Sequence, residues 1–307
     1  MGGQKSREII GQALKAKADW VNRRLTAAAH LGTPYGEETI TETMLLDLRL
    51  ELSGRLAVTP YTKYQESRVT GADWEWWFCD GIGRRMYGMR VQAKKLKLVN
   101  GSPAYDFAYR PNKRKERQVD RLLANARDAG LPAVYALYNG PELDLSLFAW
   151  SCCTEQPSAS VFGVSMISAA AARRLADIGQ TTLADAGALS LPWSCCALCP
   201  TPLRHKAWDL WPEGAGDEVT LFVADLVTDL LAKDGTRSVR LRELEAATGF
   251  RTWDEAPIYV RQMVEDARQE TAEGVLRNEL PIELPAGLGG VTAFIGRLPD
   301  PRARDDL

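Results

Sequence analysis

Three polar side chains lie on two neighbouring segments that the sequence predicts to be strands of a hairpin. The first segment carries Asp73 within Gly-Ala-Asp-Trp-Glu-Trp-Trp-Phe, and the second carries Gln92 and Lys94 within Arg-Val-Gln-Ala-Lys-Lys. The first segment is rich in aromatic residues, the second contains the β-branched Val91, and the turn-forming pair Asp80-Gly81 separates them. Because side chains alternate along a strand, we expect all three polar side chains on one sheet face. A carboxylate, an amide oxygen and an ammonium group that meet there have the layout of a metal-dependent phosphodiesterase.

Each of these side chains suits a step in the hydrolysis of a phosphodiester bond. Mg²⁺ takes oxygen ligands and often only one or two carboxylates from the protein, which makes Asp73 the best ligand candidate. Gln92 would add a neutral amide oxygen, so the site would bind metal weakly until a substrate phosphate completes the ligand shell. Lys94 would stabilise the transition state or hold the attacking water. We therefore expect Mg²⁺ as the cofactor, with Mn²⁺ as an alternative.

This arrangement resembles the PD-(D/E)XK nuclease superfamily, and most closely its Mrr-like restriction branch, where the last acidic position is commonly Gln within a Gln-Ala-Lys run. The matching residues are Asp73, Gln92 and Lys94, with eighteen residues between the first two. The chain is also similar to an uncharacterised bacterial family with the same two sequence runs. The resemblance covers roughly residues 33–140. It implies a catalytic role for the three residues, a DNA substrate, and a cytoplasmic enzyme of bacterial restriction or antiviral defence.

The resemblance also implies a further acidic residue from the first helix of the nuclease core. Glu38 and Glu42 are four residues apart and therefore share a helix face. Glu42 has a competing role, because a threonine three residues earlier would form a capping box with it. We favour Glu38 as the catalytic acid and keep Glu42 and Glu66 as alternatives. Glu75 is expected on the sheet face of Asp73, where it serves either the site or a basic side chain.

Basic residues are concentrated around these positions, although the net charge of the whole chain is only −2. The segment from Arg84 to Arg121 contains twelve lysines and arginines against three acidic residues. Such side chains bind the phosphates of a nucleic acid, whereas the alternative is a solvated loop and a charged helix face. Beside the proposed site we prefer phosphate binding. The expected nucleic-acid contacts are Lys95, Lys97, Lys113, Arg114, Lys115 and Gln118.

Hydrophobic periodicity predicts the elements that must position these residues. Helices are expected at 4–29, 37–53 and 112–129, and strands near 56–64, around Asp73, around Gln92 and at 131–138. The order of a helix, three strands, a helix and a strand agrees with the αβββαβ core that the resemblance implies. We therefore expect an α/β (α+β) restriction-endonuclease-like fold with a mixed central sheet. Its parts would be an N-terminal helix (1–32), the nuclease-like core (33–140) and a mainly helical C-terminal extension (141–307). Further strands are expected at the start of this extension.

The extension carries weaker patterns. A strand is expected at 160–167, with helices at 168–176 and 217–232. Two further helices, 241–249 and 253–267, have the outline of a helix-turn-helix. Residues 237–268 contain six basic and six acidic side chains, whereas a helix that reads DNA usually lies in a positive field. We therefore expect ordinary packing there, or a surface for a partner or activator.

The cysteines and histidines do not complete a recognisable site. Cys196 and Cys199 have the spacing of zinc ligands, and His205 or an earlier cysteine pair would have to complete the set. Without a second Cys-x-x-Cys pair we expect reduced cysteines and no zinc. His30 and His205 are the only histidines, and neither lies in a motif, which favours a metal mechanism over Ser–His or Cys–His chemistry.

Two classes of function remain. The first is a Mg²⁺-dependent endonuclease, and the second is an inactive nuclease-fold protein that serves as a binding module or scaffold. Retention of both Asp73 and Lys94 favours the enzyme, because a decayed site would be free to lose either. No apolar run approaches the eighteen residues that a membrane span needs, so we expect no membrane contact. A homodimer is left open.

Overall fold

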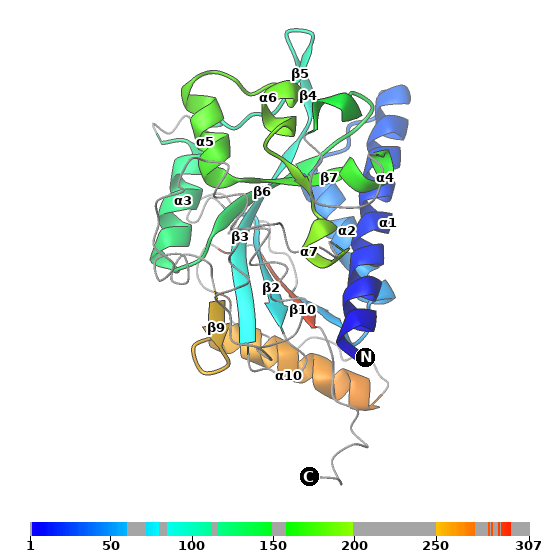
Figure 1. Ribbon diagram of the computed structural model, residues 1–307, viewed down its shortest axis with the longest axis vertical. Helices are drawn as coiled ribbons and strands as arrows, with labels where there is room; N and C mark the ends of the chain where they lie inside the picture. Colours follow the sequence, from blue (N-terminus) through cyan, green and yellow to red (C-terminus); the bar gives the residue numbers. More distant parts are fainter. Residues whose placement is uncertain are drawn as a thin grey trace.

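The computed structural model describes residues 2–59, 72–79, 85–111, 116–148, 158–198, 250–273 and 290–295, together with residues 282, 284 and 288. Within these residues the chain forms one mixed eight-stranded sheet flanked by helices (Figure 1), which confirms the expected α/β (α+β) class. A second, two-stranded sheet lies beside it.

Seven strands follow one another across the central sheet, and an eighth pairs with the beginning of one of them. In spatial order the seven are β1 (Leu56–Val58), β10 (Val291–Ile295), β2 (Trp74–Cys79), β3 (Arg85–Lys95), β6 (Ala133–Tyr138), β7 (Val164–Ser168) and β8 (Leu191–Pro192). The eighth strand, β9 (Phe250–Thr252), pairs with Arg85–Tyr87 of β3. The pairs β10–β2 and β3–β6 are parallel, and the others are antiparallel.

Helices cover both faces of this sheet, with α1 along one side of Figure 1 and α3 and α5 along the other. One face packs against α1 (Gly2–His30), α2 (Glu37–Glu51) and α7 (Cys195–Leu198). The other face packs against α3 (Gln118–Asp128), α5 (Ala169–Asp177) and α6 (Leu183–Gly187), and towards β10 against α10 (Ile258–Glu273). The short helices α4 (Ala159–Phe162) and η2 (Leu145–Leu147) complete the described helices. Because both faces are covered, β2 and β6 are buried along their whole length.

The hairpin of β2 and β3 has the alternation that the sequence predicts. Trp74 pairs with Val91, and Glu75 pairs with Arg90. Trp74 and Val91 belong to the core beneath α1 and α2. Their neighbours along each strand therefore point to the opposite face. Gln92 consequently lies on the same face as Glu75 and Arg90, at the end of the strand where α2 and α3 both begin.

A small projecting hairpin follows β3. It consists of β4 (Lys97–Val99) and β5 (Ser102–Ala104) and extends away from the sheet (Figure 1). Asn100 and Gly101 form its turn with φ angles of 51° and 81°, a conformation that this dipeptide adopts readily. The hairpin begins beside the candidate site, because Lys97 lies at its base.

The central sheet continues past residue 140, where we expected the nuclease-like core to end. β7, β8 and β9 all join it, and β10 lies between β1 and β2. β10 is entirely buried and runs parallel to β2, with Phe294 stacked on Phe78 at 4.8 Å between ring centroids. The C-terminal part therefore contributes strands to the same sheet as the hairpin of Asp73 and Gln92, in addition to its helices.

Other boundaries differ from those expected. Residues 159–162 form α4 instead of the start of a strand, and β7 begins only at Val164. The intervening Gly163 allows α4 to approach α1, since a Cβ atom there would lie 1.9 Å from the Ala18 carbonyl oxygen. The helix expected over 253–267 runs instead from Ile258 to Glu273, after the strand β9. The expected helices at 217–232 and 241–249 and the end of the strand near 56–64 lie outside the described residues.

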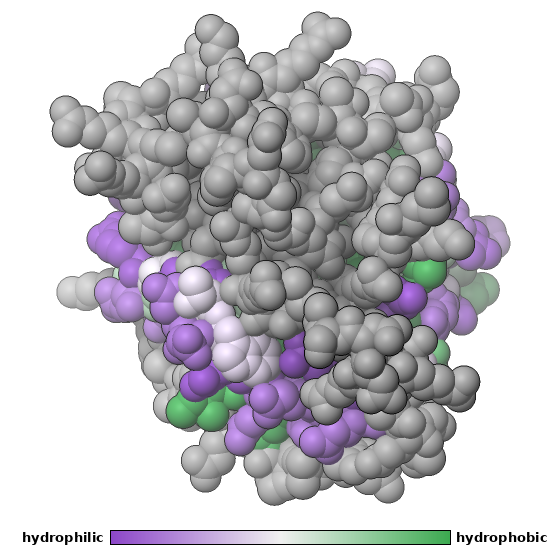
Figure 2. All heavy atoms as spheres, turned by 60° about the horizontal axis from the view of Figure 1, so that its bottom comes forward, coloured by the Kyte–Doolittle hydropathy of each residue, from purple (hydrophilic) through white to green (hydrophobic). Residues whose placement is uncertain are grey.

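In the described part of the chain, no helix is both long enough and apolar enough to cross a bilayer. Where Figure 2 colours described residues, hydrophilic side chains predominate and hydrophobic ones occur in small separate groups.

Candidate functional site

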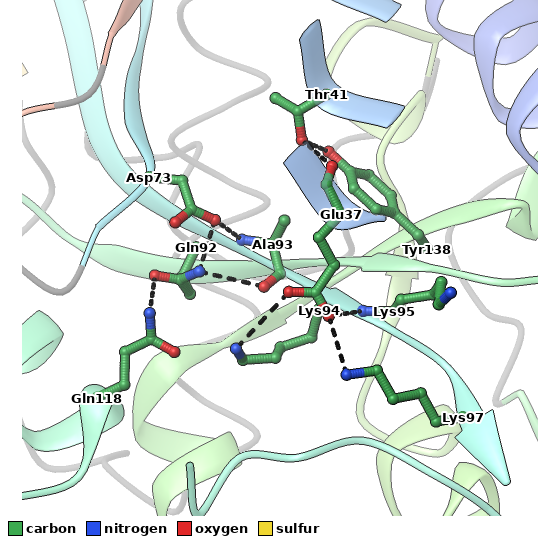
Figure 3. Close-up of polar contacts among 10 residues, drawn as sticks. All are labelled: Glu37, Thr41, Asp73, Gln92, Ala93, Lys94, Lys95, Lys97, Gln118 and Tyr138. Atoms are coloured by element: carbon green, nitrogen blue, oxygen red, sulfur yellow. Dashed lines mark hydrogen bonds and ion pairs between the residues drawn. The ribbon is translucent and has the colours of Figure 1, made fainter. Parts of the chain in front are cut away.

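An open pocket of about 620 Å³ lies where the beginnings of α2 and α3 meet the end of β3. Seven residues singled out from the sequence line it: Glu38, Asp73, Gln92, Lys94, Lys95, Lys97 and Gln118. Three more of the expected residues, Lys113, Arg114 and Lys115, lie outside the described part of the chain, as does the alternative acid Glu66. The fold therefore gathers side chains from five segments of the chain in one place (Figure 3).

Asp73 lies just before β2 and points towards β3. Its backbone N–H donates to the Val91 carbonyl oxygen at 2.9 Å, which continues the hairpin ladder by one residue. Its Oδ2 atom accepts hydrogen bonds from the Ala93 backbone N–H at 2.7 Å and from Gln92 Nε2 at 2.5 Å. Burial raises the pKa of Asp73 from 3.8 to about 6, although the Ala93 hydrogen bond and the nearby Lys94 charge oppose this rise. The carboxylate is thus costly to charge without a further cation.

Gln92 and Gln118 lie end to end behind Asp73 (Figure 3). Gln92 Oε1 accepts a hydrogen bond from Gln118 Nε2 at 2.8 Å. Gln118 is the first residue of α3, because Arg117 before it has extended backbone angles and forms the N-cap. Gln118, which was expected from the sequence as a nucleic-acid contact, lines the pocket and contacts Gln92 there.

Lys94 is buried beside the N-terminus of α2. Its Nζ atom lies 3.9 Å from Glu37 Oε2 and 5.1 Å from the ring centroid of Tyr109. The neighbouring Lys95 donates from Nζ to the Tyr35 carbonyl oxygen at 2.8 Å, so its head group is tied to the segment before α2. Lys97, in contrast, has a side chain that is 53% exposed. Lys97 is therefore better placed than Lys95 to meet a ligand that arrives from solvent.

Glu37 is the acid of the first core helix that contacts the lysines of the pocket. It accepts a hydrogen bond from the Lys95 backbone N–H at 2.8 Å and lies 3.8 Å from Lys97 Nζ. Glu38, the residue favoured from the sequence, lines the same pocket. The expected capping box with Glu42 is wrong, because α2 begins at Glu37 with Gly36 as its N-cap and no side-chain cap bond.

Sequence reasoning also missed two pocket residues in the loop between β5 and α3, Asp106 and Tyr109. Neither belongs to a motif or to a periodic element, so no local signal marked them. Glu37 had a usable signal, because it is the first residue of the helix that the sequence predicts over 37–53.

Glu75 serves a basic side chain and not the pocket. Its Oε1 atom lies 3.0 Å from Arg90 Nε, and its Oε2 atom accepts hydrogen bonds from Trp77 Nε1 at 2.9 Å and from the Tyr259 hydroxyl at 2.8 Å. The Glu75 side chain is 0% exposed. Burial and the Glu75 charge raise the pKa of Tyr259 well above its ordinary value. This buried cluster joins α10 to the β2–β3 hairpin.

The donor atoms in the pocket suit a hard cation. Asp73 and Glu37 supply carboxylates, and Gln92 and Gln118 supply amide oxygens, of which Gln118 Oε1 is buried and has no hydrogen-bond partner in the described structure. Mg²⁺ prefers such oxygen ligands and leaves positions for water and phosphate. Among the described residues, no group of three or more His, Cys, Asp or Glu side chains is arranged so that it could hold a metal ion. Cys79 and Cys195 are buried, whereas Cys199 and His205 lie outside the described residues.

Replacing Asp73 by asparagine is expected to stabilise the metal-free protein at pH 8. The folded-state pKa of Asp73, near 6, exceeds the unfolded value of 3.8. Charging this carboxylate therefore lowers the free energy of unfolding of the wild-type protein, and this loss is absent below pH 4 and complete above pH 6. Asparagine carries no charge, and its oxygen still accepts from the Ala93 N–H. We expect a gain of about 1–3 kcal/mol in the free energy of unfolding at pH 8.

This prediction is measured by urea unfolding in EDTA at pH 8 and pH 4.5. The measurement at pH 4.5 serves as the control, because any effect of the substitution on hydrogen bonding would change the free energy of unfolding at both pH values. A difference between variant and wild type that is equal at the two pH values would show that the Asp73 charge is not the cause.

Comparison with known proteins gives a family but no characterised relative. No curated protein matches the chain. The model of the family of unknown function DUF6615 matches residues 10–282, which include every element of the pocket and most of the described sheet. The chain therefore belongs to this family of unknown function, DUF6615.

Proposed function

We propose that this protein is a Mg²⁺-dependent nuclease that hydrolyses the phosphodiester bonds of DNA. The observation that carries the proposal is the convergence of Asp73, Gln92 and Lys94 in one pocket, with Glu37 from α2 beside them. A carboxylate pair, amide oxygens and a buried lysine form a site with both metal-binding and anion-stabilising groups.

The residues have distinct roles in this proposal. Asp73 and the Gln92 amide oxygen would hold the cation, and Glu37 would hold Lys94 in place through their ion pair. When bound, Mg²⁺ acts as a Lewis acid on the phosphate and lowers the pKa of its water. Lys94 carries a positive charge to the point where negative charge grows on phosphorus-bound oxygens. The chain thus supplies positioning and electrostatic stabilisation.

A nucleic acid is the substrate class that the surrounding charge supports. Lys94, Lys95 and Lys97 follow one another along the pocket wall, and Lys97 is half exposed. Lysine and arginine side chains bind phosphates without regard to base sequence. The resemblance to Mrr-like restriction nucleases supports DNA over RNA, and it supports a role in bacterial restriction or antiviral defence in the cytoplasm.

Incubation of the purified full-length chain with supercoiled plasmid DNA tests the proposal. We expect nicked and linear products with Mg²⁺ and none with EDTA, because the carboxylate site needs its cation. Mn²⁺ is expected to replace Mg²⁺. A parallel reaction with single-stranded RNA of the same length distinguishes the two nucleic acids.

Two outcomes would contradict the proposal. Cleavage that persists in EDTA would exclude the metal mechanism. Intact plasmid at all Mg²⁺ and Mn²⁺ concentrations, together with retained DNA binding in a filter assay, would favour the alternative of an inactive nuclease-fold binding protein.

A further inference from the structure

Two buried amide side chains form a chain of hydrogen bonds that leads away from Asp73. Gln92 Nε2 donates to Asp73 Oδ2, and Gln92 Oε1 accepts from Gln118 Nε2. Gln92 is 2% exposed and Gln118 is 4% exposed. Bulk water therefore has little access to either amide, and each end of each amide must find its partner within the protein.

The orientation of the two amide groups in this row of hydrogen bonds follows from the chemistry of Asp73. A carboxylate oxygen accepts hydrogen bonds and donates none, so Gln92 must present its nitrogen to it. Gln92 then presents its oxygen to Gln118, which must answer with its own nitrogen. This arrangement leaves the oxygen of Gln118 unused, because Oε1 is buried and has no hydrogen-bond partner in the described structure. A buried acceptor without a partner costs free energy, so the resting arrangement is incomplete at its outer end.

The Gln92 nitrogen occupies the position that a metal-binding oxygen would need beside Asp73. It lies 2.5 Å from Asp73 Oδ2 and 3.2 Å from the Ala93 carbonyl oxygen, to which it also donates. If both amides turned over, the Gln92 oxygen would take this place and three oxygens would face one another. Such an arrangement is repulsive alone and favourable around Mg²⁺. In the same turn, the unpartnered Gln118 oxygen would accept from the Gln92 nitrogen.

We propose that Gln92 and Gln118 form a coupled amide pair whose two side chains turn over together when a divalent cation binds at Asp73. Gln118 is the positioning residue: only an acceptor at its place can hold Gln92 with the oxygen towards the metal. The resting orientation keeps a hydrogen-bond donor between the Asp73 and Ala93 oxygens and holds the site together without metal. This inference rests on the proposed function, because it assumes that Asp73 binds a divalent cation.

Titration with Mn²⁺ alone, followed by the EPR signal of the free ion, tests the pair without any substrate. We expect Gln118→Met to weaken Mn²⁺ binding about 10-fold or more, as loss of a group that orients a metal ligand usually does. Gln92→Glu removes the need for orientation, since both ends of a carboxylate are oxygens. In that background, Gln118→Met is expected to weaken binding by less than about threefold.

The four proteins of this cycle separate the possible outcomes. If Gln118→Met binds Mn²⁺ as tightly as the wild-type protein does, the coupled amide pair is overturned and the nuclease proposal is left intact. An equal loss in both backgrounds would also overturn it, because it would make Gln118 a general packing residue. Failure of the wild-type protein to bind Mn²⁺ would overturn the metal site itself, and the amide pair with it.

A second measurement uses only wild-type protein and so does not depend on the folding of a variant. Addition of Mg²⁺ is expected to move the side-chain NH₂ resonances of Gln92 and Gln118 in ¹⁵N-correlated NMR spectra at the same metal concentrations. Gln180, which is exposed and does not line the pocket, provides the internal control. Movement of the Gln92 signal while the Gln118 signal stays in place would contradict a coupled turn.

Discussion

Replacing Lys94 by methionine is expected to lower the rate of plasmid cleavage by about 10²-fold or more, the usual cost of removing one preorganised stabilising group. Methionine keeps the buried stem beside Tyr109 but removes the only charge with which this side chain meets the phosphate. We expect the free energy of unfolding to change by less than about 1 kcal/mol, because the lost ion pair to Glu37 is long. Glu37 retains its bond from the Lys95 backbone.

Lys97→Met is the matched control for this prediction. Lys97 also lies within 4 Å of Glu37, at 3.8 Å, but its side chain is largely exposed. We expect it to raise KM by a few-fold at low salt and to leave kcat within about twofold, as loss of one phosphate contact would. Steady-state cleavage of a fluorescent duplex measures both constants. A Lys94→Met enzyme with normal kcat would remove Lys94 from the catalytic step.

Replacing Arg90 by methionine is expected to destabilise the fold by about 3–5 kcal/mol, because it leaves a buried carboxylate without its counter-charge. Glu75 lies wholly inside the protein and would keep only its hydrogen bonds from Trp77 and Tyr259. The substitution would also remove the hydrogen bond that Arg90 donates to Asn125 on α3. Urea unfolding at pH 8 measures the loss.

The double variant Glu75→Gln/Arg90→Met provides the control for charge. Glutamine keeps an oxygen for Trp77 and Tyr259 without a charge, so the double variant should recover about 2 kcal/mol or more relative to Arg90→Met. Equal stability of the single and double variants would mean that the loss comes from packing and not from the unpaired carboxylate.

The hairpin of Asp73 and Gln92 was predictable because its signals are local. Alternation along a strand is a local property, so the sequence alone separates the polar from the apolar face of each segment. The structure pairs Trp74 with Val91, and both lie in one core cluster. That register brings Asp73 to Gln92. The side chains of Asp73, Gln92 and Lys94 were therefore expected on one face of the sheet from the sequence alone.

The sequence left some choices open that an adjacent residue or a distant segment decided. The helix begins at Glu37 as expected, but periodicity does not decide which of the adjacent residues Glu37 and Glu38 contacts the lysines of β3 and β4, and in the structure Glu37 does so. Glu75 lies on the predicted face, yet its partner Tyr259 is 184 residues away on α10. No periodicity in the sequence links these positions.

The sequence by itself determined the class of fold, the hairpin and the polar face that gathers Asp73, Gln92 and Lys94, because burial of alternate side chains is encoded locally. Only the tertiary structure decided that β10 lies between β1 and β2 and that Glu75 belongs to Arg90. It also decided that two amides stand end to end behind Asp73. The physical reason is that a short apolar strand or a buried polar side chain is compatible with many partners. The choice among them depends on the free energy of packing the whole chain.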